Sequence, residues 1–173
     1  MRLRRFEADD VDNALRLFGD PLVMRHFTGV CDRDTVRRIV EKFRSEHERY
    51  GYSMLAVEQR SDGAYVGHTG LLHWDDVDGR EDVEVAYAYA PDVWGRGYAT
   101  EAARACRDWA FENLGVDRVV SFIAVENAPS VAVAERNGMS RTKRLEVNRF
   151  GRPIFVYAIT REQWQQRAQY SSE

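Results

Sequence analysis

The sequence predicts an α+β fold in which helices flank one mixed central sheet. Residues 83–89 alternate β-branched or aromatic side chains with small or acidic ones, the two-residue period of a strand. Residues 99–114 instead repeat their apolar positions every three or four residues, as on one face of a helix. The predicted elements follow in the order β, α, α, β, β, β, α, β, α, β, β. We expect one domain over residues 1–168 and a short polar tail over 169–173.

The first fifty residues predict one strand and two helices. Residues 1–6 form the strand, with Leu3 pointing inward. A helix follows an aspartate cap near residue 10, and Gly19-Asp20-Pro21 ends it. Asp32 caps a second helix that continues to about residue 50, where Gly51 ends it.

The middle of the chain predicts a hairpin and then the central strand. Residues 53–59 and 64–74 form the hairpin, because Ser61-Asp62-Gly63 supplies turn residues between them. Residues 75–82 form an acidic, solvated loop around Gly79. The central strand starts at residue 83 and stops at Pro91, which has no N–H to donate to a ladder.

The last third predicts a helix ending near Gly115, a buried strand over 118–125, and a short helix over 130–136. Residues 142–148 and 154–160 form a final hairpin around Gly151. The residues after Glu162 are polar, and we expect no more than one helical turn there, frayed at Ser171-Ser172.

The composition restricts the class of partner. The 173 residues include 25 basic and 28 acidic side chains, a net charge of −3, so electrostatics does not favour nucleic acid or an anionic membrane. No apolar run approaches about 18 residues and no signal pattern opens the chain, so we expect a cytoplasmic protein. We place Cys106 in the core and Cys31 in a loop, without a disulfide. No Cys/His cluster has the spacing of a metal site, so we expect no metal.

A glycine-rich turn joins the central strand to the next helix. Gly95 and Gly97 let an anion approach the backbone closely, and the first N–H groups of a helix attract negative charge. Arg96 adds a positive charge between them. The turn therefore predicts a phosphate or pyrophosphate site, with a plain strand-to-helix turn as the alternative. A Walker loop is absent, and the third glycine of a dinucleotide fingerprint is missing.

The run Trp94-Gly95-Arg96-Gly97-Tyr98-Ala99 resembles the [QR]-x-x-G-x-[GA] loop of the GCN5-related N-acetyltransferases. The longer run over residues 84–102 resembles the RimJ/RimL-like branch, where Trp commonly replaces the first residue of the motif. The resemblance implies the acetyltransferase fold and acetyl-CoA as cosubstrate. It places the pyrophosphate on main-chain N–H groups of residues 95–100, which include Thr100.

A second resemblance covers Asn127 to Ser130 and the Gly138-Met139 pair, similar to the N-x-x-S…G-[FM] segment of the same branch. It implies that Asn127 contacts the pantetheine arm and that the Ser130 hydroxyl lies near the sulfur. Many relatives carry a tyrosine acid at the position of Ala134, so Ser130 is our substitute for that acid. The alternative is that Asn127 and Ser130 are only turn and capping residues.

Acetyl transfer requires a base, because an alkyl ammonium titrates near pH 10 and must lose a proton before it attacks. Glu84 is our candidate, since it lies on the central strand just before the loop, where many branch members carry an acid. The alternatives are that Glu84 pairs with Arg118 or Arg141, or faces solvent. Glu81 and Asp82 are rival acids that we place in an exposed loop.

The resemblance also implies that backbone N–H groups of Tyr87 and Tyr89 hold the acetyl carbonyl and pantetheine, because the sheet splays beside this strand. By position, we expect Met24, Phe27, His73 and Trp74 to form the wall of an acceptor pocket.

We therefore predict direct, acetyl-CoA-dependent N-acetylation of a primary amine, either a protein N-terminal α-amine or a small molecule. The alternatives are a longer acyl-CoA or an O-linked acceptor, a catalytically silent acyl-CoA sensor, and a dinucleotide-binding regulatory domain. The expected partner is the amine acceptor. The sequence leaves its identity open, and it also leaves open whether the chain forms a homodimer.

Overall fold

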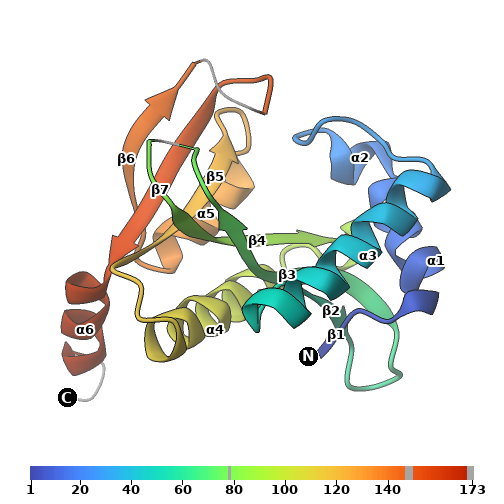
Figure 1. Ribbon diagram of the computed structural model, residues 1–173, viewed down its shortest axis with the longest axis horizontal. Helices are drawn as coiled ribbons and strands as arrows, with labels where there is room; N and C mark the ends of the chain where they lie inside the picture. Colours follow the sequence, from blue (N-terminus) through green and yellow to red (C-terminus); the bar gives the residue numbers. More distant parts are fainter. Residues whose placement is uncertain (78, 147–149, 171–173) are drawn as a thin grey trace.

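The computed structural model describes residues 1–77, 79–146 and 150–170. It contains a seven-stranded sheet in the order β1-β2-β3-β4-β5-β7-β6 (Figure 1). Its strands are β1 (Arg2–Arg5), β2 (Met54–Glu58), β3 (Tyr65–Trp74), β4 (Asp82–Tyr89), β5 (Arg118–Ala124), β6 (Ser140–Leu145) and β7 (Ile154–Thr160). Only the β4–β5 pair is parallel, so the sheet is mixed and the predicted α+β class is confirmed.

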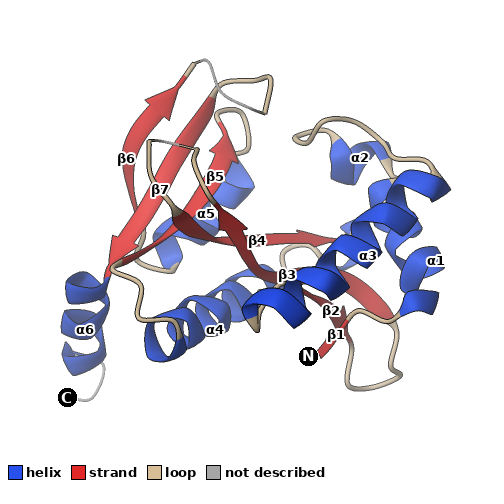
Figure 2. Ribbon diagram, in the orientation of Figure 1, coloured by secondary structure: helices blue, strands red, loops and turns tan. Residues whose placement is uncertain are grey.

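Helices cover both faces of the sheet (Figure 2). They are α1 (Val11–Phe18), α2 (Pro21–Met24), α3 (Arg33–Tyr50), α4 (Tyr98–Asn113), α5 (Ala128–Arg136) and α6 (Arg161–Tyr170), with 3₁₀ turns η1 (Ala8–Asp10) and η2 (Pro91–Val93). Helices α1 to α3 share one buried cluster with β2 and the end of β4. Helices α4 and α5 pack with β3, β5 and β7 in another, in which Cys106 is buried. No helix within the described ranges has the length and apolarity needed to cross a bilayer.

The C-terminal segment differs from the prediction, because α6 is a ten-residue helix rather than a single turn. Thr160 and Gln163 bond reciprocally at its start, with side chain to backbone distances of 2.9 and 3.2 Å. Trp164 stacks on Phe111 with ring centroids 5.1 Å apart and donates to Asp108 at 2.7 Å. These long-range contacts stabilise a helix that its polar sequence does not predict. Ser171-Ser172 lie outside the described residues.

The final hairpin also begins earlier than expected, since β6 starts at Ser140 and ends at Leu145. The expected end of that strand at Asn148 lies outside the described residues.

The parallel strands β4 and β5 are held together at one end only. Their pairing is recorded at a single position, Glu84 opposite Val120. Beside it, the Arg118 guanidinium donates two hydrogen bonds to the Asp82 carboxylate, at 2.7 and 2.5 Å. Asp82 is buried at the start of β4, so its predicted place in an exposed loop is wrong. Beyond this clamp the strands diverge.

We expect Arg118→Leu to lower the free energy of unfolding by about 3 kcal/mol, because it leaves the buried Asp82 carboxylate without its bidentate partner. Urea denaturation followed by circular dichroism measures the change. The double variant Arg118→Leu/Asp82→Leu is the control and should recover most of the loss, since no buried charge remains. A single variant as stable as the parent would contradict this role of the clamp.

Candidate active site

Two cavities meet where β4 and β5 diverge. The larger, of about 830 Å³, lies between the start of α4, the end of β4, α5 and the segment after α2. The smaller, of about 310 Å³, lies between β3, β4, β5 and the segment after α2. Both are lined by His26, Phe27, Tyr87, Asn127 and Ser130. A ligand in the larger cavity can therefore reach a second ligand in the smaller one.

The diverging edge of β4 turns backbone donors toward this junction. Ala90 donates its N–H to Val66 on the β3 side at 2.9 Å. Strand alternation therefore turns the N–H groups of Tyr87 and Tyr89 to the opposite side, toward β5. The recorded β4–β5 pairing stops at Glu84, before both tyrosines. This geometry matches the open ladder expected there.

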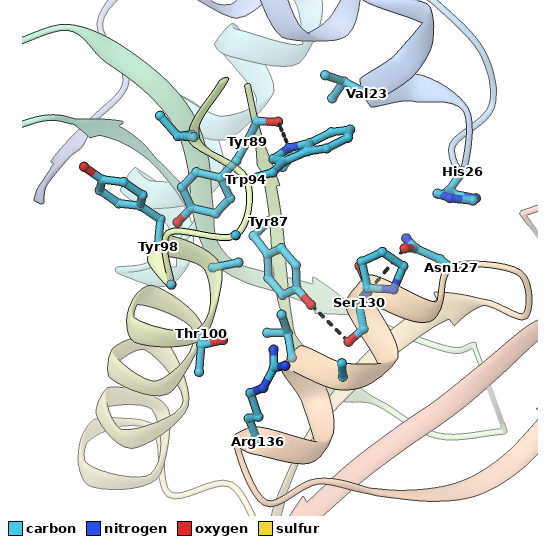
Figure 3. Close-up of a pocket in the computed structure, with 18 of the residues that line it drawn as sticks. Val23, His26, Tyr87, Tyr89, Trp94, Tyr98, Thr100, Asn127, Ser130 and Arg136 are labelled. Carbon is cyan, nitrogen blue, oxygen red and sulfur yellow. Dashed lines mark hydrogen bonds between the residues drawn. The ribbon is translucent and has the colours of Figure 1, made fainter. Parts of the chain in front are cut away.

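The loop after β4 ends in an uncapped helix N-terminus. Gly95 and Gly97 have φ angles of +75° and +86°, which favour glycine, and nothing lies within 4 Å of a Cβ at either position. Gly97 is the N-cap of α4 and supplies no side chain to its first N–H groups. Tyr98, Ala99 and Thr100 line the larger cavity here, as labelled in part in Figure 3. Open space beside uncapped donors is the arrangement that an anionic diphosphate requires.

Trp94 ties this loop to the end of β4. Its indole N–H donates to the Tyr89 carbonyl at 2.7 Å, drawn as a dashed line in Figure 3. This bond gives a partner to a β4 carbonyl that lost its place in the sheet where β4 diverges from β5. Arg96 is placed differently from the other loop residues, because it does not line the cavity and its N–H donates to Val93 at 3.4 Å.

Three arginines that the sequence reasoning missed also line the larger cavity, Arg25 just after α2, Arg104 on α4 and Arg136 on α5. Arg104 lies four residues after Thr100, and that spacing puts both on one helix face. The helical spacing from Thr100 could therefore have predicted from the sequence that Arg104 faces the same cavity. Only the packing of α5 beside α4 brings Arg136 to the same cavity.

Asn127 and Ser130 are both capping residues and cavity residues. The Asn127 side chain accepts a hydrogen bond from the Ser130 N–H at 3.3 Å, which caps α5. The Tyr87 hydroxyl donates to the Ser130 carbonyl at 3.3 Å (Figure 3). The capping alternative is thus present in the structure, and it holds both residues at the junction. Ala134, at the position of the family's tyrosine, is buried in the core.

Glu84 is a buried carboxylate at the point of divergence. It accepts the Trp74 indole N–H at 2.7 Å and the Phe122 backbone N–H at 3.1 Å. Burial raises the pKa of Glu84 to about 7, against the lowering effect of these two hydrogen bonds. The acid lines the smaller cavity. A carboxyl group with this pKa can accept a proton near neutral pH.

The alternative partners expected for Glu84 are engaged elsewhere. Arg118 pairs with Asp82, and Arg141 lies over the Phe155 ring at 4.8 Å from its centroid. Glu84 does not face solvent either, since only 7% of it is exposed. Glu81, the other rival acid, is exposed.

Three of the four residues expected in the acceptor pocket line the smaller cavity, namely Met24, Phe27 and Trp74. His73 does not line either cavity. It bonds Tyr52 at 3.3 Å and Asp75 at 3.1 Å, and its ring stacks on Tyr50. The reason is strand alternation, because neighbours on β3 point to opposite faces of the sheet. No metal-binding trio of His, Cys, Asp or Glu occurs among the residues that the structure describes.

Comparison with protein families finds a match to the acetyltransferase (GNAT) domain over residues 1–140. The chain is 32% identical over 158 residues to the uncharacterized protein YkkB of Bacillus subtilis, covering 91% of this chain and 90% of that one. It is 25% identical over 167 residues to the uncharacterized N-acetyltransferase YnaD of the same organism, covering 94% of each.

A solved GNAT-family acetyltransferase from Bacillus anthracis has the same fold, with a TM-score of 0.77 and 26% identity over 92% of this chain and 94% of that chain. The chain therefore belongs to the GNAT acetyltransferase family, and it is an acyltransferase.

Proposed function

We propose that this acyltransferase transfers an acetyl group from acetyl-CoA directly to a primary amine, and that it belongs to the RimJ/RimL-like branch. The observation that carries the proposal is the meeting of two cavities at the divergent edge of β4, with Glu84 on one side and the glycine loop on the other. The branch assignment is supported by Trp94 and by the Asn127 to Ser130 segment.

The larger cavity suits coenzyme A. The uncapped N-terminus of α4, over Tyr98 to Thr100, offers N–H groups to the diphosphate. Arg104 and Arg136 add positive charge for the remaining phosphate. The extended pantetheine arm would then follow β4, with Asn127 beside it, and bring the thioester to the junction.

The chemical step follows from the groups at that junction. Glu84 takes the proton of the ammonium, and the nitrogen lone pair forms a bond to the thioester carbonyl carbon. A free N–H on the β4 edge stabilises the negative charge that develops on the carbonyl oxygen. The C–S bond then breaks, and we assign Ser130 to relay a proton: its hydroxyl protonates the leaving thiolate and takes up the second nitrogen proton in exchange, which leaves a neutral amide and the free thiol of CoA. No covalent enzyme intermediate is needed, since the thioester is already activated.

We expect Gly97→Asp to weaken acetyl-CoA binding at least about 30-fold, because it places a carboxylate beside the diphosphate. Isothermal titration calorimetry measures the dissociation constant. Gly115→Asp is the matched control at the other end of α4, where φ is +64° and nothing lies within 4 Å of a Cβ. It should change affinity by less than about twofold, and equal losses in both variants would count against the site.

We expect kcat/KM of the parent enzyme to fall as pH drops through about 7, because protonated Glu84 cannot accept a proton. Glu84→Gln should lower the rate at neutral pH about 100-fold and lose that inflection. Its rate should still rise at higher pH as more amine becomes neutral.

Release of free thiol, followed across a pH series, measures both profiles. Glu81→Gln, at the exposed rival acid, is the control and should match the parent. A Glu84→Gln profile with the parent's inflection would remove Glu84 from the mechanism.

A further inference from the structure

We propose, building on the function above, that the acceptor is a small primary monoamine with an apolar body. The site as built disfavours polyamines, aminoglycosides and other polycations, and it disfavours a polypeptide N-terminus. The composition, geometry and roof of the smaller cavity carry this inference.

Most residues that line the smaller cavity are apolar. Glu84 is the sole acid among its described lining residues, and the other polar ones are Ser121, Asn127, Ser130, His26, Thr28 and Arg152. The apolar part of the wall comes from the sheet, α1, α2 and α3, including Phe18, Met24, Ile39, Leu72, Phe122 and Ile154. The reacting nitrogen therefore belongs beside Glu84, and the body of the acceptor against the apolar part of the wall.

Three aromatic rings form one side of this apolar part of the wall. Trp74 meets Phe150 edge to face with centroids 5.4 Å apart, and it meets Phe122 at 6.2 Å and 81°. The Trp74 ring cannot turn freely, because its N–H is bonded to Glu84. A fixed aromatic wall of this kind suits an aliphatic or aromatic group.

Apart from Glu84, the described residues that line this cavity offer no carboxylate to a second ammonium on the acceptor. Burying an unpaired ion is strongly unfavourable, whereas burying an apolar group of the same size is favourable. The described cations nearby repel a second ammonium: Arg152 lines the cavity and pairs with Glu126 at 3.5 Å, and Arg25 lines the neighbouring cavity.

The cavity is also roofed. Arg152, between β6 and β7 in sequence, donates to the carbonyls of Arg25 and Phe27 at 3.3 and 2.5 Å. The contact bridges the segment after α2 and the segment before β7, and Phe27 and Arg152 both line the cavity, so the bridge leaves less room for a polypeptide. At about 310 Å³, the cavity lies at the small end of the range for ligand pockets.

The apolar surroundings also favour the reaction with such an amine. Desolvation lowers the pKa of an ammonium and raises that of a carboxyl group, so it brings the two closer together. Burial has this effect on Glu84, whose pKa rises to about 7. Transfer of the proton from a monoamine to Glu84 thus costs less here than in water.

The test compares hexylamine with cadaverine, in which an ammonium replaces the terminal methyl group at the same chain length. Thiol release at fixed acetyl-CoA gives kcat/KM for each, with phenethylamine, spermidine, kanamycin and a tripeptide with a free N-terminus as further arms. We expect hexylamine and phenethylamine to exceed every polycation and the tripeptide at least about 100-fold.

A charge variant separates polarity from shape. Ile39 lines the cavity from α3 and is partly buried. Ile39→Glu supplies a second carboxylate, and Ile39→Gln is its neutral control of equal size. Relative to Ile39→Gln, we expect Ile39→Glu to shift the ratio of hexylamine to cadaverine at least about tenfold toward cadaverine, with unchanged affinity for acetyl-CoA.

Turnover of cadaverine, spermidine, kanamycin or the tripeptide that equals or exceeds that of hexylamine would overturn this inference and leave the proposed N-acetyl transfer intact. Equal ratios in the two Ile39 variants would also count against it. An enzyme that binds acetyl-CoA in calorimetry but releases no thiol with any amine would refute the proposed function, and the acceptor class with it.

Discussion

The divergence of β4 from β5 is the constraint on which the rest of this site depends. The two strands pair at Glu84 and Val120 and are clamped beside that position by Arg118 and Asp82. A continuous ladder would bond the N–H groups of β4 and leave no space beside them. Because the ladder stops, one backbone edge of β4 faces two cavities.

The opening creates unsatisfied groups, and neighbouring residues satisfy most of them. Trp94 bonds the exposed Tyr89 carbonyl, Ser121 bonds the Val85 carbonyl at 2.8 Å, and the Glu84 carboxylate accepts the Phe122 N–H. The groups near the clamp are thus occupied by protein, whereas the α4 N-terminus has no side-chain cap. The N–H groups that stay open to a ligand are those at the α4 N-terminus and those of Tyr87 and Tyr89 on the edge of β4.

Burial of Glu84 supports its proposed role as a base but lowers the stability of the folded chain at high pH. Its folded-state pKa of about 7 lies above the ordinary value of 4.5, so the folded chain holds the proton more tightly than the unfolded chain does. The contribution of this group to stability is therefore fully present below about pH 4.5 and is lost as pH rises through about 7. At high pH, a neutral residue at this position would give the chain a larger free energy of unfolding. The same desolvation makes the carboxylate a stronger base near neutral pH.

By itself, the sequence determined the features that depend on local chemistry. Glycines before a helix, Asp32 as the cap of α3 and the period of β4 are properties of short segments, and they predicted the fold and the glycine loop that we propose holds the cofactor. The tertiary structure decided what depends on long-range contacts. It buried Asp82 against Arg118, ordered α6 through Trp164 and Phe111, and turned His73 away from the cavity that its neighbour Trp74 lines. It also brought Arg136, Phe150 and Arg152 to the cavities from distant segments, because proximity across a fold leaves no periodic signal in the chain.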